Sequence, residues 1–230
     1  MTPLTIGLVM YPDMTQLDLT APHQVFASLP QAKVHLLWKT LDPVISNGGL
    51  TILPTTTFAD CPPLDVLCVP GGVMGTVQMM QDSEMLAFLG NQGATAKYVT
   101  SVCTGSLILG AAGLLQGYRA ATHWAFREIL TTCGATVSTE RVEIDRNRIT
   151  GGGVTAGIDF ALTIVGLLCD ENTAQFLELM LEYNPQPPFK TGSPELASER
   201  LIQQVQVVGK ELIAASLAAA QNSIGAVKSV

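Results

Sequence analysis

The chain has 230 residues, of which 47% are hydrophobic and only 13% are charged, and its formal net charge at pH 7 is −7. Because typical globular proteins carry about 25% charged residues, we expect this chain to bury much of its surface in a large core and in a subunit interface. The acidic balance argues against a nucleic-acid-binding surface, which would need clustered Lys and Arg.

The chain shows no targeting or membrane signal. Its opening "MTPLTIGLVMYPD" has neither a basic region nor a small-residue cleavage site. The apolar window from Leu107 to Leu115 is too short to span a bilayer. The cysteines are irregularly spaced and form no CxxC pair, so neither a metal knuckle nor a redox pair is indicated. They are Cys61, Cys68, Cys103, Cys133 and Cys169. We therefore expect reduced thiols and a cytoplasmic location.

Short uncharged strands alternate with helices along the chain. Strands are predicted at 4–11, 33–40, 65–72 and 96–103, with a hairpin over 45–60 and two extended runs turning at 145–147. Helices are predicted at 19–29, 83–92, 104–115 and 123–134, over the long stretch 157–183, and once or twice after the Pro-rich segment 184–194. Strands this apolar predict an α/β fold with a mostly parallel sheet covered on both faces.

A cysteine occupies the joint between a strand and a helix in "YVTSVCTGSLILGAAGLL" (98–115). Ligands of open α/β sheets bind beyond the carboxyl ends of the strands, and a sharp turn there exposes the side chain of Cys103. Gly105 would relieve crowding in that turn. The helix N-terminus would stabilise a thiolate and depress its pKa. The alternative is that Cys103 is a small core residue, as free cysteines usually are.

Other strand ends at the same edge offer partners for this thiol. Asp18 follows the first strand and its loop, where it is a candidate proton donor or acceptor; its other interpretation is an N-cap of the first helix. Gly71 and Gly72 follow "LCVP" and are expected to present backbone N–H groups to a ligand. His123, before the predicted helix at 123–134, is a weaker candidate for substrate contact.

Four segments in this order resemble the DJ-1/PfpI superfamily across nearly the whole chain. They are "IGLVMYPDMTQLDLTAPHQVF", "DVLCVPGG", "TSVCTGSLILGAAGLLQGYRAATHW" and "RITGGGVTAGIDFAL". Within the superfamily the chain looks most like the isonitrile hydratases, because Asp18 stands where many relatives carry Glu and Thr104 follows Cys103. The resemblance implies a flavodoxin-like three-layer α/β sandwich and a homodimer. It also implies one domain over 1–230, with a C-terminal helical extension from about 194.

The resemblance further implies a lyase that hydrates isonitriles, R–N≡C, to N-substituted formamides without metal or organic cofactor. Cys103 would be the nucleophile that forms a covalent thioimidate, and Asp18 the general acid and base. Thr104 would position water or substrate, while Gly71, Gly72 and Gly105 would line the substrate site. Peptidases of the superfamily carry His directly after the cysteine, so Thr104 disfavours a Cys–His dyad.

Two other functions stay open at this point. Similar domains begin AraC-type transcription regulators, where the domain would be a ligand sensor. Only 41 residues follow "NPQPPF", with few basic residues, too little for two helix-turn-helix units. The second alternative is another thiol chemistry, such as a glyoxalase, a deglycase or a redox-sensing cysteine. Asp18 in place of Glu and Thr104 in place of His weigh against it.

Overall fold

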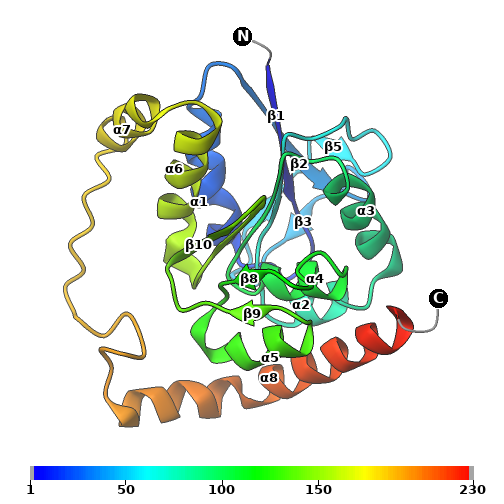
Figure 1. The fold of residues 1–230 in the computed structure, drawn as a ribbon, viewed down its shortest axis with the longest axis vertical. Helices are drawn as coiled ribbons and strands as arrows, with labels where there is room; N and C mark the ends of the chain where they lie inside the picture. Colours follow the sequence, from blue (N-terminus) through cyan, green and yellow to red (C-terminus); the bar gives the residue numbers. More distant parts are fainter. Residues whose placement is uncertain (1–2, 228–230) are drawn as a thin grey trace.

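The protein is described by a computed structural model over residues 3–227. A seven-stranded sheet forms its centre, in the order β10-β11-β7-β6-β1-β2-β5 (Figure 1). Its strands are β1 (Leu4–Val9), β2 (Ala32–Trp38), β5 (Thr56–Thr57), β6 (Val66–Val69), β7 (Tyr98–Val102), β10 (Val142–Asp145) and β11 (Arg148–Gly151). All neighbouring strands are parallel except the antiparallel pair β10 and β11. This confirms the predicted, mostly parallel α/β fold.

Helices cover both faces of the sheet, which explains why its central strands are apolar throughout. On one side α1 (Gln16–Ala27) packs against α6 (Gly157–Leu168), and α7 (Glu171–Met180) packs on α6 (Figure 1). On the other side α3 (Ser83–Gly93) packs against α4 (Gly105–Ala111). The long α8 (Glu199–Val227) crosses α2 (Met74–Met79), α4 and α5 (Arg127–Thr132) (Figure 1).

Short elements complete the chain. They are the strands β3 (Val44–Ile45), β4 (Thr51–Ile52), β8 (Arg119–Ala120) and β9 (Thr136–Val137), and the 3₁₀ turns η1 (Trp124–Phe126) and η2 (Val154–Ala156). The predicted hairpin is the β3–β4 pair, and the predicted turn at 145–147 joins β10 to β11. Over residues 3–227 we find no helix with both the length and the hydropathy needed to cross a membrane.

Several predicted helices differ from those observed. α1 begins at Gln16, before the predicted start, and it accommodates Pro22. The stretch 157–183 is two helices, because Asp170 caps α7 by accepting a hydrogen bond from the Thr173 N–H at 2.8 Å. The segment predicted over 123–134 starts as η1 and becomes helical only at Arg127. The C-terminal segment, predicted as one helix or two, is a single helix.

Close backbone packing at the carboxyl end of β6 requires a glycine at the start of α4. A Cβ on Gly105 would overlap the carbonyl oxygens of Val69 and Pro70. The helix can therefore begin directly beside the end of the neighbouring strand only if this residue has no side chain. The sequence-based expectation that Gly105 relieves crowding in the turn agrees with this packing.

Gly105→Ala should destabilise the protein by about 3 kcal/mol, because the added methyl group meets backbone that cannot move independently. Urea denaturation followed by circular dichroism measures this loss. Gly90→Ala in α3 is the matched control: apart from its chain neighbours and the backbone of its own helix, no atom of the described residues lies within 4 Å of the added Cβ. That substitution should raise stability by about 0.5–1 kcal/mol through helix propensity. Equal effects at the two positions would contradict this description of the joint.

Candidate active site

The carboxyl ends of β1, β6, β7 and β11 meet at one edge of the sheet, and the residues that follow them surround Cys103. Cys103 comes directly after β7 and adopts φ 55°, in the left-handed region that non-glycine residues rarely occupy. Its N–H donates to the carbonyl oxygens of Gly151, at 3.1 Å, and Gly152, at 2.9 Å. Its own carbonyl accepts from the hydroxyls of Ser106, at 3.0 Å, and Thr122, at 3.1 Å. These bonds hold the strained conformation in place.

Asp18 brings a fully buried carboxyl group to this edge. It lies in the first turn of α1, and the N-cap is Thr15, so the N-cap interpretation of Asp18 is wrong. Oδ2 accepts a hydrogen bond from the Gly71 N–H at 3.0 Å. Oδ1 has no hydrogen-bond partner among the described residues. A buried carboxyl oxygen without a partner is costly, and such groups are typical of sites that carry chemistry.

Asp18 and Cys103 perturb each other's protonation. Burial raises the pKa of the Asp18 carboxyl to about 7, and the Gly71 N–H, followed by the nearby Cys103 thiol, opposes that rise. Burial, followed by the negative charge of Asp18, raises the pKa of the Cys103 thiol well above its usual value. Above about pH 7 the pair therefore retains one proton, with an ionised carboxyl beside a neutral thiol.

The depressed thiol pKa expected from the sequence is wrong. A helix N-terminus contributes at most about 2 kcal/mol in favour of a thiolate, and α4 is only seven residues long. Desolvation of a thiol that is 5% exposed opposes ionisation more strongly, and the neighbouring carboxylate adds to it. At neutral pH the Cys103 thiol therefore keeps its proton, and the Asp18 carboxylate beside it is the group that could accept that proton.

Two backbone N–H groups, of Thr104 and Val154, interact with the Cys103 sulfur and lower its pKa against these effects. Val154 lies in η2, between β11 and α6. Its role could not be found from the sequence, because a backbone donor leaves no side-chain signal. The run Gly151–Gly153 just before it was the available hint of close backbone approach.

The N–H groups of Gly71 and Gly72 form hydrogen bonds with other predicted site residues, so they are not available to a ligand. The Gly71 N–H bonds to Asp18, and the Gly72 N–H donates to the Thr104 hydroxyl at 3.0 Å. The same hydroxyl lies 3.1 Å from the Gly72 carbonyl and 3.1 Å from the Thr76 hydroxyl. The expectation that the two glycine amides face substrate is therefore corrected: they fix Asp18 and Thr104.

Gly71 is a glycine for a steric reason. A Cβ there would lie 2.6 Å from the Thr104 nitrogen and 2.7 Å from Asp18 Oδ2. Any side chain at this position would separate the loop after β6 from both groups.

The sequence makes His123 a weaker candidate for substrate contact. In the structure its side chain caps η1 by accepting a hydrogen bond from the Ala125 N–H at 3.3 Å.

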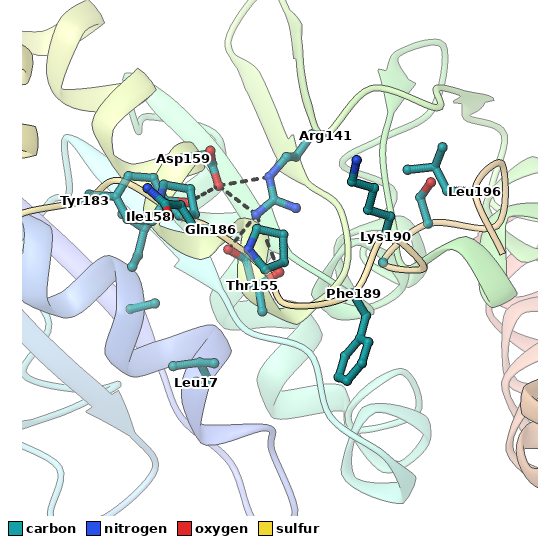
Figure 2. A pocket seen from close by; sticks show the side chains of 15 residues that line it. Leu17, Arg141, Thr155, Ile158, Asp159, Tyr183, Gln186, Phe189, Lys190 and Leu196 are labelled. Atoms are coloured by element: carbon teal, nitrogen blue, oxygen red, sulfur yellow. Dashed lines mark hydrogen bonds and ion pairs between the residues drawn. The ribbon is translucent and has the colours of Figure 1, made fainter.

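A cavity of about 830 Å³ lies between α1, α6 and the segment after α7 (Figure 2). Apolar side chains such as Leu17, Ile158 and Phe189 line it, together with Arg141 and Asp159. Neither Asp18 nor Cys103 lines this cavity. Two lining residues are adjacent in sequence to residues of the site: Leu17 precedes Asp18, and Thr155 follows Val154, whose N–H interacts with the Cys103 sulfur.

The chain has close relatives among known proteins. It is 55% identical over 203 residues to the isonitrile hydratase of Pseudomonas putida, covering 88% of this chain and 89% of that protein. It is 32% identical over 174 residues to the HTH-type transcriptional regulator GbdR of Pseudomonas aeruginosa, covering 71% of this chain but 46% of the regulator.

Solved structures agree with this relationship. The crystal structure of a THiJ/PfpI family protein from Pseudomonas syringae superposes with a TM-score of 0.93 at 48% identity, over 96% of this chain and 91% of that chain. Drosophila melanogaster DJ-1beta shares the fold, with a TM-score of 0.73 at 20% identity over 79% of this chain and 98% of that one. The DJ-1/PfpI family pattern matches residues 5–167. The chain belongs to the DJ-1/PfpI family.

Proposed function

We propose that this protein is a lyase that hydrates isonitriles to N-substituted formamides, with Cys103 as nucleophile and Asp18 as the group that moves protons. The observation that carries the proposal is the pairing of a buried, incompletely hydrogen-bonded carboxyl with a thiol at a strained strand-to-helix turn. The 55% identity to an isonitrile hydratase selects the substrate class. No metal or organic cofactor enters the reaction that we propose.

The first step joins sulfur to the isonitrile carbon. Above about pH 7 the pair holds one proton, on the thiol. The Asp18 carboxylate accepts that proton as the sulfur attacks the terminal carbon, and then delivers it to the same carbon. The S–H bond is broken, S–C and C–H bonds are formed, and the product is the thioimidate R–N=CH–S–Cys103. The N–H groups of Thr104 and Val154 stabilise the charge that develops on sulfur.

The second step consumes water. Asp18 Oδ1, which has no hydrogen-bond partner among the described residues, is the atom available to orient and deprotonate a water molecule. Addition of the water to the thioimidate carbon, with a proton passing to nitrogen, gives R–NH–CH(OH)–S–Cys103. Collapse of this adduct expels the thiol and releases R–NH–CHO, and the pair recovers its single proton.

Thr104 is assigned a positioning role within this reaction. Its hydroxyl is already bonded to Gly72 and Thr76, so its N–H is the group directed to the reacting sulfur. Gly72 and Gly105 also have positioning roles: the Gly72 N–H holds the Thr104 hydroxyl, and Gly105 allows α4 to begin beside the end of β6. The apolar composition of the chain suits an apolar R group.

A homodimer in the cytoplasm, with no nucleic-acid partner, completes the proposal. Support for a dimer comes from apolar side chains that remain exposed on α7, among them Phe176 at 64% and Leu179 at 81%. All five cysteines lie in the described part of the chain and are free, as expected in a reducing compartment. A non-enzymatic sensor is the second candidate, favoured by the similarity to the regulator GbdR.

Formation of formamide from an aryl isonitrile tests the function. We expect wild-type protein to turn over the isonitrile and Cys103→Ala to lose activity by a factor of about 10⁴ or more, because the covalent route is removed. Cys68→Ala is the matched control: this thiol is buried, and its pKa is raised to about 12. A folded wild-type protein without turnover would favour the sensor instead. Full activity of Cys103→Ala would contradict the nucleophile.

The pH dependence of kcat/KM tests the role of Asp18. The carboxyl must be ionised to accept the thiol proton, and burial raises its pKa to about 7. Activity should therefore rise with pH through about 7 and reach a plateau above it. Asp18→Asn should lose about 10²–10⁴-fold of the activity together with this rising limb. If Asp18→Asn kept the rise of kcat/KM through pH 7, a group other than Asp18 would be responsible for that rise.

A further inference from the structure

The segment between β11 and α6, residues 152–156, contacts Cys103 from two sides; we call it the η2 loop. Gly152 accepts the Cys103 N–H at 2.9 Å and so helps to hold the strained turn. Val154 presents its own N–H to the sulfur. A small movement of this loop would alter both the conformation of Cys103 and the stabilisation of its negative charge.

Arg141 binds this loop at both ends. Its backbone carbonyl accepts from the Gly152 N–H at 2.9 Å. Its guanidinium donates through Nη2 to the Thr155 carbonyl at 2.9 Å and through Nε to Asp159 Oδ2 at 2.9 Å, in the first turn of α6. Figure 2 shows the Arg141 side chain directed at both groups from the wall of the cavity. The contacts to Gly152, Thr155 and Asp159 therefore lie on both sides of Val154 in the sequence.

Tyr183 extends the arrangement to the segment after α7. Its hydroxyl donates to Asp159 Oδ2 at 2.8 Å, so the same carboxylate oxygen receives both Arg141 and Tyr183 (Figure 2). Asp159 is thereby fixed in orientation from two directions, and it holds the guanidinium in the plane that reaches the Thr155 carbonyl.

We propose that Arg141 is a positioning residue that keeps the η2 loop where the Val154 N–H faces the Cys103 sulfur. It touches neither the reacting atoms nor the thiol, and it acts through the backbone on either side of Val154. The expected effect on turnover rests on the proposed function, whereas the expected effect on the thiol does not.

The energetics favour positioning over stability. The Arg141 side chain is 52% exposed, and ion pairs this accessible contribute about 0–1 kcal/mol to folding. The geometry requires arginine, because a planar guanidinium donates in two directions at once whereas a lysine ammonium is a single point charge. Arg141→Lys therefore retains the charge but loses the two-pronged contact.

The test uses the full chain and two readouts. The titratable groups that face the Cys103 sulfur are Asp18, from α1, and Tyr11, beyond β1. With these unchanged, Arg141→Met should move the midpoint of Cys103 alkylation by iodoacetamide to higher pH by about 0.5 units or more, because the thiolate loses a hydrogen bond. Mass spectrometry of the Cys103 peptide separates this thiol from the other four. For an aryl isonitrile, kcat should fall about 10-fold with little change in KM.

Arg119→Met is the matched control. It removes a similarly exposed arginine, 59% accessible, whose ion pair with Glu143 lies outside the η2 loop, and it should leave the alkylation midpoint and kcat unchanged. An Arg141→Met profile that superimposes on wild type would overturn the proposal, whether or not isonitriles are turned over. If Arg141→Met does not fold, Arg141→Lys decides by the same readout: an upward shift supports the proposal and an unchanged midpoint overturns it. Absence of turnover in every variant, with the midpoint still shifted, would overturn the proposed function alone.

Discussion

The burial of one carboxyl group, that of Asp18, is the constraint on which the site depends. The pKa of this carboxyl rises from an ordinary value of 3.8 to about 7 in the folded protein. Between these values the folded state binds a proton that the unfolded state has released, so this group's contribution to stability falls as the pH rises through that window. Near neutral pH the burial of Asp18 therefore lowers the folding stability of the protein. In the reaction proposed here, this carboxylate is the base that accepts the Cys103 proton, and its pKa of about 7 suits that role near neutral pH.

The surroundings of the pair follow from the need to hold a costly carboxyl and a strained cysteine together. Gly71 is needed because any side chain would collide with Asp18 and Thr104, and Gly105 because α4 starts against the carbonyls of Val69 and Pro70. The hydroxyls of Thr104, Thr76 and Tyr11 form a buried chain that ends on the Pro70 carbonyl. Polar networks of this kind fix geometry when their members are satisfied. The unpartnered Oδ1 of Asp18 is the exception among these described groups, and it lies where the chemistry is proposed.

Much of the fold could be predicted from the sequence, because buried parallel strands are uncharged and the turns carry glycine and asparagine. Cys103 could be singled out by its place between a strand and a helix. The direction of its pKa shift could not, because burial by distant elements outweighs the local helix effect. The use of the Gly71 and Gly72 amides by Asp18 and Thr104 depends on tertiary contacts that no spacing reveals. No side-chain pattern in the sequence singles out Val154 or Arg141. Val154 interacts through a backbone N–H, which leaves no side-chain signal, and Arg141 looks like a residue of an ordinary surface ion pair.

The most direct test of nucleophilic catalysis by Cys103 is to look for the covalent intermediate itself. Wild-type protein is mixed with an aryl isonitrile, quenched in acid within one turnover and digested for mass spectrometry. We predict an added mass equal to one isonitrile on the Cys103 peptide, which disappears as formamide is released. Turnover without an adduct, or with an adduct on one of the other four cysteines, would contradict this role of Cys103.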